Sequence, residues 1–260
     1  MTTQPIVAIN ESQHQNYLSL SSCGECRSYK FCPMKSVHFD GFSKVIVAKH
    51  RILHKHNELY RQGEKVKSLY MVRSGAVKTQ RIFQDGAEQI MGFYLPGDML
   101  GFDGLAKCNY RTSAIALGTV AVCEFSYDVL DTLIGKQQDL ARHCMQLMSE
   151  EIVREQQMIS SLALRTAEER LADFLVDLSG RYAERGLLAT PILVPMLRRD
   201  IGNYLGVKPE TVSRMLKRFQ NAGWIKVNRS QIDILDMSML KFNQATSPIC
   251  GIKLIFQQES

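Results

Sequence analysis

Residues 198–220 read RRDIGNYLGVKPETVSRMLKRFQ, and this stretch predicts two short helices joined by a tight turn. Gly206 stands between the two apolar runs, where the turn favours a residue that tolerates a positive φ. Pro209 follows in the first turn of the second helix, where its missing N–H costs little. Gly202 is small at the point where two crossing helices approach each other. The stretch therefore predicts a helix-turn-helix.

The second helix of this pair has a polar outer face. Once the apolar positions are set aside, its outward side chains are Glu210, Thr211, Ser213, Arg214 and Lys217, followed by Arg218. An arginine can hold guanine O6 and N7 together, and a glutamate can accept from cytosine N4. Lys217 and Arg218 are better placed to contact the phosphate backbone. The face predicts binding to double-stranded DNA, and the alternative is an ordinary helical hairpin with a solvated basic face.

The residues around this helix support the DNA interpretation. Residues 224–227 and 231–234 are two short β-like runs separated by Asn228-Arg229-Ser230, the pattern of a hairpin wing. Residues 198–229 hold eight Lys and Arg against two acidic residues, in a chain of net charge +6. Concentrated positive charge favours a polyanionic partner. The C-terminal part is therefore predicted to be a winged helix-turn-helix.

Short β-rich runs alternate with turn signals from Gly41 to about Tyr127. The runs are Val45–Val47, Ser68–Val72, Ala76–Phe83, Gln89–Tyr94, Ile115–Leu117 and Val120–Phe125. Many short strands at this spacing predict an antiparallel sandwich or roll. Asp85-Gly86 between two such runs predicts a hairpin turn.

A helical segment between these two parts has a narrow stripe of mostly apolar residues. The stripe advances in steps of three and four through Met145, Met148, Ile152, Glu155, Ile159 and Leu162. This is the seam of a coiled coil, interrupted once by an acid. We expect it to pack against the same helix of a second subunit, giving a homodimer. The alternative is that it packs on its own domain, with Glu155 turned to solvent.

The chain is thus expected to have an α+β fold with five parts. They are an N-terminal arm (1–36), a β-roll sensor domain (37–135), a dimerisation helix (136–164), a winged helix-turn-helix domain (165–245) and a tail without an assigned role (246–260). Hydrophobic residues make up 45% of the chain, enough for a core, yet no run reaches the roughly 18 apolar residues of a membrane span. No secretory signal is visible, so a cytoplasmic protein without a membrane partner is expected.

Three cysteines stand close together in the arm. Cys23, Cys26 and Cys32 give the spacing C-x2-C-x5-C within a chain of seven cysteines. An odd number in a reducing compartment argues against a disulfide framework. The spacing fits structural zinc, an iron–sulfur cluster or redox thiols. A fourth ligand must come from elsewhere, and the candidates are Cys108, Cys123, Cys144 and Cys250.

Together these motifs resemble the Crp/Fnr family of transcription regulators over about residues 20–240. The resemblance rests on the cysteine spacing, on the recognition run 210–214, and on further stretches at 68–75, 85–90, 97–103, 122–124, 167–172 and 200–206. It implies a [4Fe–4S] cluster that forms without oxygen and breaks down with it, held by Cys23, Cys26, Cys32 and Cys123. The three other cysteines have no counterpart role.

The resemblance also implies how such a protein acts. A cluster-dependent homodimer binds an inverted-repeat DNA site through Glu210, Ser213 and Arg214, and activates or represses genes of anaerobic metabolism. It contacts RNA polymerase, and the hairpin residues Phe83, Gln84, Asp85 and Gly86 are the candidate surface; otherwise they form a plain exposed turn.

The residues bear on two alternative functions, a cyclic-nucleotide receptor and an enzyme. The same family includes cyclic-nucleotide receptors, and Arg111-Thr112 matches their phosphate-binding pair, but Phe102 stands where their ribose-binding glutamate is expected. An enzyme is not expected, because none of the nucleotide-binding, nucleophile-elbow or metalloprotease motifs is present.

Overall fold

The computed structural model describes residues 26, 28–36 and 48–241. The chain forms two compact units, residues 1–157 and 158–260, and the boundary falls inside the long helix α2 (Gln138–Leu164).

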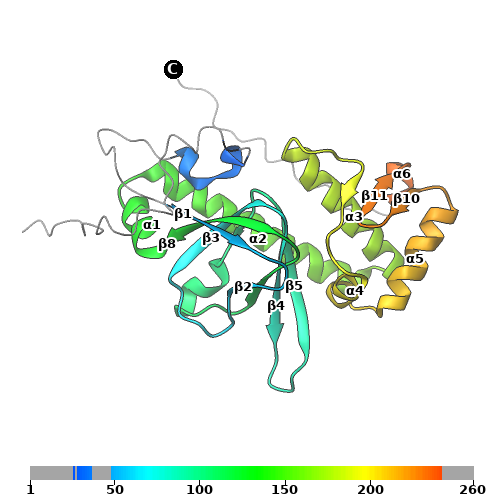
Figure 1. Cartoon of the computed structure of the whole chain (residues 1–260), viewed down its shortest axis with the longest axis horizontal. Helices are drawn as coiled ribbons and strands as arrows, with labels where there is room; N and C mark the ends of the chain where they lie inside the picture. Colours follow the sequence, from blue (N-terminus) through cyan, green and yellow to red (C-terminus); the bar gives the residue numbers. More distant parts are fainter. Residues whose placement is uncertain (1–25, 27, 37–47, 242–260) are drawn as a thin grey trace, which may run out of the picture. The chain divides into compact units, whose positions relative to one another are not determined.

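The first unit is built on two antiparallel four-stranded sheets (Figure 1). One sheet has the order β1-β8-β3-β6 and the other the order β2-β7-β4-β5. The strands are β1 (Ala48–Leu53), β2 (Glu58–Tyr60), β3 (Ser68–Ser74), β4 (Val77–Ile82), β5 (Glu88–Tyr94), β6 (Met99–Leu100), β7 (Ser113–Ala116) and β8 (Val120–Ser126). The expected antiparallel roll is confirmed.

Alternate side chains of the first sheet pack into two different hydrophobic clusters, because successive residues of a strand point to opposite faces. Val120 and Val122 of β8 pack into a cluster with Tyr70, Val72 and residues of the second sheet, which forms the interior of the roll. On the opposite face, Cys123 and Phe125 pack with Leu69, Met71 and Met99, and with residues of the arm and of the helices that follow β8. We call this second group the arm cluster.

Short 3-10 segments and two helices complete the first unit. The segments η3 (Tyr29–Phe31) and η4 (Pro33–Ser36) belong to the arm, and η5 (Phe102–Lys107) follows β6. Helix α1 (Tyr127–Ile134) leads to α2, whose first turns bury Leu140, His143 and Cys144. Helix α1 has its C-cap at Gly135, and α2 begins two residues after position 136, where the dimerisation helix was expected to begin.

The second unit contains α3 (Ala167–Glu184), α4 (Arg198–Leu205), α5 (Pro209–Asn221) and α6 (Met237–Leu240), with a sheet of order β10-β11-β9. Its strands are β9 (Ile192–Leu193), β10 (Ile225–Asn228) and β11 (Gln231–Ile234). Helix α3 begins with a capping box, in which Thr166 accepts from the Glu169 N–H and Glu169 accepts from the Thr166 N–H. The predicted winged helix-turn-helix is present.

Four strands were not predicted from the sequence, namely β1, β2, β6 and β9. Strand β1 reads AKHRIL, which lacks a clear alternation, and it forms through its pairing with β8. The others have two or three residues and depend on their neighbours. The predicted strand Val45–Val47 lies outside the described residues.

Candidate functional site

The turn between α4 and α5 has the geometry that the sequence predicted. Gly206 has a φ of +66°, in the left-handed region. Val207 donates its N–H to the Gly202 carbonyl at 2.8 Å, and a Cβ at Gly202 would lie 2.6 Å from the carbonyl oxygen of Val207. Lys208 is the N-cap of α5 without a side-chain cap bond, and Pro209 opens the helix. Because Gly202 has no side chain, α4 and the turn before α5 can approach each other closely.

Helix α5 buries one face and exposes the other. Its buried residues are Val212, Met215, Leu216 and Phe219. The predicted DNA-reading side chains Glu210, Ser213, Arg214, Lys217 and Arg218 are exposed, and Thr211 is half-buried. Arg214 donates to Thr211 Oγ1 at 3.3 Å, and the Ser213 hydroxyl donates to the Pro209 carbonyl at 3.1 Å. The exposed face carries donors and an acceptor suited to base edges.

Arg218 has a partner that the sequence did not indicate. Its guanidinium contacts the carboxylate of Glu168 in the first turn of α3, fifty positions away in the chain. A phosphate at this position must share the guanidinium with Glu168. The contact connects the C-terminal half of α5 to α3.

The wing follows α5 directly. Strands β10 and β11 pair from Ile225 with Ile234 to Asn228 with Gln231, and Arg229 turns the hairpin with a φ of +53°. The ring of Trp224 packs against Phe219, with centroids 5.2 Å apart. The wing is therefore attached to the core of α5, and it presents the exposed cations Lys226 and Arg229.

The structure brings two of the four predicted cluster ligands together. Cys32 from the arm and Cys123 from the middle of β8 are both buried in the arm cluster. Cys26 is half-buried, and Cys23 lies outside the described residues. Over residues 26, 28–36 and 48–241, no group of three or more His, Cys, Asp or Glu side chains is arranged to hold a metal ion.

The other cysteines differ from one another in their surroundings. Cys144 of α2 is buried in the same arm cluster, and burial raises the pKa of its thiol to about 11. Cys108 is exposed, and Cys250 lies outside the described residues. Cys144 was one of the candidates for the fourth ligand, and no sequence spacing indicated that it shares a cluster with Cys32 and Cys123.

The stripe on α2 is largely uncovered within one chain. Met145, Ile152, Ile159 and Leu162 are 64%, 54%, 67% and 43% exposed, and Met148 is half-buried. Glu155 is exposed too, and its pKa is raised by partial burial first and by the charges of Glu151 and Asp103 second. Exposed apolar side chains in a row indicate a surface for another protein.

Two further predicted regions have defined surroundings. The hairpin of Phe83, Gln84, Asp85 and Gly86 is exposed, and Asp85 accepts from the Ala87 N–H. The second region is the pair Arg111-Thr112, which matches the phosphate-binding pair of cyclic-nucleotide receptors. The carboxylate of Asp103 accepts from the Arg111 backbone N–H at 3.1 Å and from the Thr112 hydroxyl at 2.8 Å. Two of the donors that could bind a phosphate, the Arg111 backbone N–H and the Thr112 hydroxyl, thus donate to an acid of the chain itself, which the sequence alone did not indicate.

An antiparallel roll followed by a winged helix-turn-helix defines a class of DNA-binding transcription regulators. Residues 169–242 match the Crp-like helix-turn-helix domain and residues 50–137 match the cyclic nucleotide-binding domain. The chain belongs to the Crp/Fnr family, as the resemblance in its sequence indicated.

Similar proteins agree with this assignment. An anaerobic regulatory protein of Haemophilus influenzae is 41% identical over 84% of this chain and 86% of its own. A fumarate and nitrate reduction regulatory protein of Yersinia pestis is 41% identical over 88% of this chain and 90% of its own. The solved structure of FixK2 from Bradyrhizobium japonicum has a TM-score of 0.70 and 30% identity, covering 75% of this chain and 96% of that one. The first two are regulators by name, in line with the expectation that this chain is not an enzyme. None of the helices in the described part of the chain is long and apolar enough to cross a membrane.

Proposed function

We propose that this protein is an oxygen-responsive regulator of genes of anaerobic metabolism, in which a bound [4Fe–4S] cluster promotes homodimerisation and sequence-specific DNA binding. The ligands are Cys23, Cys26, Cys32 and Cys123. When bound, the cluster would react with oxygen, and this reaction would remove the cluster from the protein. The DNA-binding part of the proposal rests on the exposed face of α5, and the sensing part rests on the cysteines.

The observation that carries the sensing part is the shared burial of Cys32 and Cys123. Their sulfurs belong to one hydrophobic cluster, although the residues are far apart in the chain. Thiolates are the donors that iron–sulfur clusters take. A dry surrounding also limits the access of water and oxygen to such a group. The residues present therefore suit the group that the resemblance to the Crp/Fnr family implies.

The DNA-binding part requires two copies of the chain. A dimer of helix-turn-helix units contacts two half-sites about one helical turn apart. The exposed stripe from Met145 to Leu162 is the surface through which we expect the copies to pair. Glu210, Ser213 and Arg214 then contact base edges, and Lys217 and Arg218 contact phosphates. We further propose that the hairpin at Phe83–Gly86 contacts RNA polymerase.

Anaerobic purification tests the sensing part. About four iron and four sulfide per chain are expected, with an absorption spectrum that bleaches when air is admitted. Loss of the metal should shift the protein from dimer to monomer in sedimentation. Zinc as the sole metal, or a cluster that is stable in air, contradicts the proposal. As a control, Cys108→Ser should keep the iron and sulfide content of the unmodified chain, because the exposed Cys108 thiol has no assigned role.

Binding of a cyclic nucleotide is the second candidate function, and the match of residues 50–137 to the cyclic nucleotide-binding domain favours it. Asp103 opposes it, because its carboxylate takes up the Arg111 backbone N–H and the Thr112 hydroxyl. Calorimetric titration with cyclic AMP should show no saturable binding. Micromolar binding by the unmodified chain would overturn our preference for the oxygen response.

A further inference from the structure

The turn that joins β5 to β6 is contacted by two regions to which the proposed function gives separate roles. The turn comprises Leu95–Asp98, and its Gly97 N–H donates to the Val72 carbonyl at 2.8 Å while the Val72 N–H donates to the Asp98 carbonyl at 3.0 Å. These bonds hold it against the central strand β3. The turn is therefore a fixed part of the roll and not a free loop.

The cysteine arm packs against this turn through Phe31. Gly97 has a φ of +96°, and a Cβ at this position would lie 3.2 Å from three carbon atoms of the Phe31 side chain. Phe31 immediately precedes Cys32, one of the proposed ligands. Nearby, the buried Ser28 hydroxyl donates to the Arg73 carbonyl at 3.5 Å. The absence of a side chain at Gly97 thus lets the arm lie directly on the backbone of the turn.

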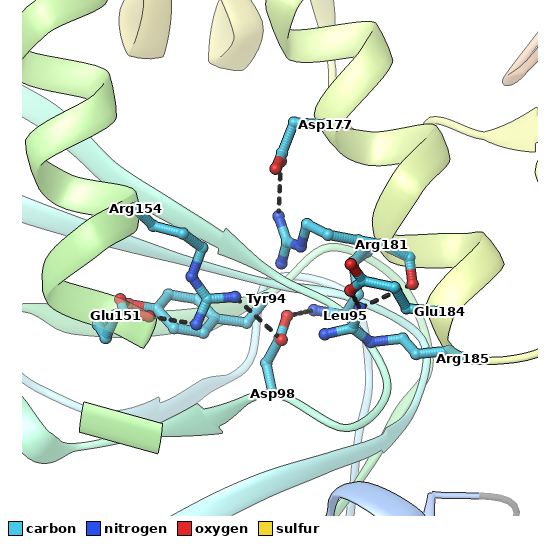
Figure 2. Close-up of polar contacts among 9 residues, drawn as sticks. All are labelled: Tyr94, Leu95, Asp98, Glu151, Arg154, Asp177, Arg181, Glu184 and Arg185. Atoms are coloured by element: carbon cyan, nitrogen blue, oxygen red, sulfur yellow. Dashed lines mark hydrogen bonds and ion pairs between the residues drawn. The ribbon is translucent and has the colours of Figure 1, made fainter. Parts of the chain in front are cut away.

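The dimerisation helix contacts the same turn through Arg154. Asp98 is 4% exposed, and its carboxylate accepts from the Leu95 N–H at 2.7 Å and from Arg154 Nη1 at 3.2 Å. Figure 2 shows Arg154 reaching from α2 to Asp98 and to Glu151 of its own helix. The Arg154–Glu151 distance is 2.5 Å.

Tyr94 forms a second link between the roll and α2. Its hydroxyl donates to Glu151 at 2.6 Å, and burial, followed by the charge of Glu151, raises the pKa of Tyr94 well above its ordinary value. Tyr94 is the last residue of β5 and is adjacent to the turn. Breaking an ion pair with a buried member leaves a charge without its compensation, so these contacts resist separation.

We infer that Phe31, Gly97, Asp98 and Arg154 form a relay that couples the conformation of the cysteine arm to the position of α2. The inference rests on the proposed function, and it names the residues through which occupancy of the cysteine site reaches the dimer surface. The residues are positioning residues, since none is a ligand and none belongs to the stripe. Because both regions contact one fixed turn, we expect a change in either contact to affect the other.

The first experiment measures amide hydrogen exchange in the full chain without a cluster. Arg154→Ala should speed exchange at residues 28–32 by about threefold or more, because local opening of the arm becomes easier. Arg142→Ala is the matched control on the same helix, since Arg142 pairs with Asp139 at 3.5 Å on an exposed face. Unchanged exchange at residues 28–32 in Arg154→Ala overturns the relay, whether or not the chain binds a cluster.

The second experiment measures dimer dissociation by sedimentation under anoxia. Arg154→Ala and Asp98→Asn should keep the iron and sulfide content of the unmodified chain and dimerise about tenfold more weakly, which corresponds to about 1.4 kcal/mol. Gly97→Ala should have the same effect from the arm side, and combining it with Arg154→Ala should add little, because residues of one network are not additive.

The outcomes distinguish a failure of the proposed function from a failure of the relay. If the unmodified chain carries no cluster, the proposed function fails, and the exchange experiment still decides on the relay. If the cluster is present and these variants dimerise as tightly as the unmodified chain or more tightly, the relay is wrong. Additive effects of Gly97→Ala and Arg154→Ala also contradict it, because the two sites then act independently.

Discussion

The backbones of Gly202 and Val207 lie so close that no side chain fits between them, since a Cβ at residue 202 would be 2.6 Å from the carbonyl oxygen of Val207. This contact fixes where α5 begins relative to α4. A carbonyl of the backbone cannot move aside as a flexible side chain can. The arrangement of the two helices therefore depends on residue 202 having no side chain.

Gly202→Ala is expected to destabilise the second unit by about 1–3 kcal/mol, the usual cost of overpacking. Urea unfolding followed by fluorescence measures it, because Trp224 is the one tryptophan of the chain and lies in this unit. Gly180→Ala is the control. A Cβ at Gly180 meets nothing within 4 Å, so alanine in this helix should stabilise by about 0.5–1 kcal/mol. Equal stability of the two variants would show that the turn can relax.

Arg214 and Lys217 should affect DNA binding in different ways. Arg214→Ala is expected to lose about 1–3 kcal/mol of binding to the inverted-repeat site and to relax specificity at one base pair. Lys217→Ala should weaken binding to all sequences alike and lower the salt dependence by about one phosphate contact. Dissociation constants on the intact and on singly substituted duplexes, at several salt concentrations, distinguish the two effects. The same pattern in both variants contradicts the assigned roles.

Glu155→Ala should favour dimerisation of the chain without a cluster. Two copies of this acid facing each other across the stripe would repel by about 1 kcal/mol, which is close to fivefold in the dissociation constant. Because the pKa of Glu155 is raised, acidification should neutralise it early. Dimerisation of the unmodified chain should then strengthen as the pH falls through that pKa, and the variant should lack this response.

The control for this prediction is Glu150→Ala. Glu150 lies on the same helix, is exposed, and accepts from Gln146 at 3.0 Å. Sedimentation equilibrium of both variants in air gives the comparison. An effect of Glu150→Ala as large as that of Glu155→Ala would mean that overall charge, and not the seam position, controls assembly.

Buried His143 should make stability depend on pH. Burial, with a smaller contribution from the Lys35 charge, lowers the pKa of His143 from 6.5 to about 4. The unfolded chain therefore binds a proton in this window that the folded chain does not, so the free energy of unfolding falls as the pH falls from 6.5 to 4. With solvent screening, the loss is about 1–2 kcal/mol.

Chemical unfolding at several pH values tests this prediction. His143→Gln should flatten the pH dependence between 6.5 and 4, because the glutamine does not titrate. His54→Gln is the control, since His54 is exposed and directly follows β1. A pH dependence of His143→Gln that matches the unmodified chain would assign the loss to other groups.

Features set by local sequence were predicted well. Helices α4 and α5 are present as expected, and the turn between them follows from Gly206 and Pro209. Here the apolar periodicity and the turn residues act within a few positions of one another. The exposed polar face of α5 follows from the same periodicity.

Features set by long-range contacts were not predicted. Arg154 meets Asp98 across 56 positions, and Arg218 meets Glu168 across 50. A sequence shows the charges but not which of many acids lies within reach. The packing of Phe31 on Gly97 is of the same kind, because it depends on how the arm lies on the roll and no local pattern records this. Strand β1 likewise exists only through its pairing with β8.

The alternation along β8 restricts how the length of this chain can change. Val122 and Cys123 are neighbours in sequence, yet they lie in separate clusters on opposite faces of the sheet. Inserting or deleting one residue within β8 reverses every side chain beyond that point. The thiol of Cys123 would then turn into the roll interior and valines would face the arm. Length variation in homologous chains should therefore collect in connections such as the one at Gly118-Thr119, before β8, and avoid the strand itself.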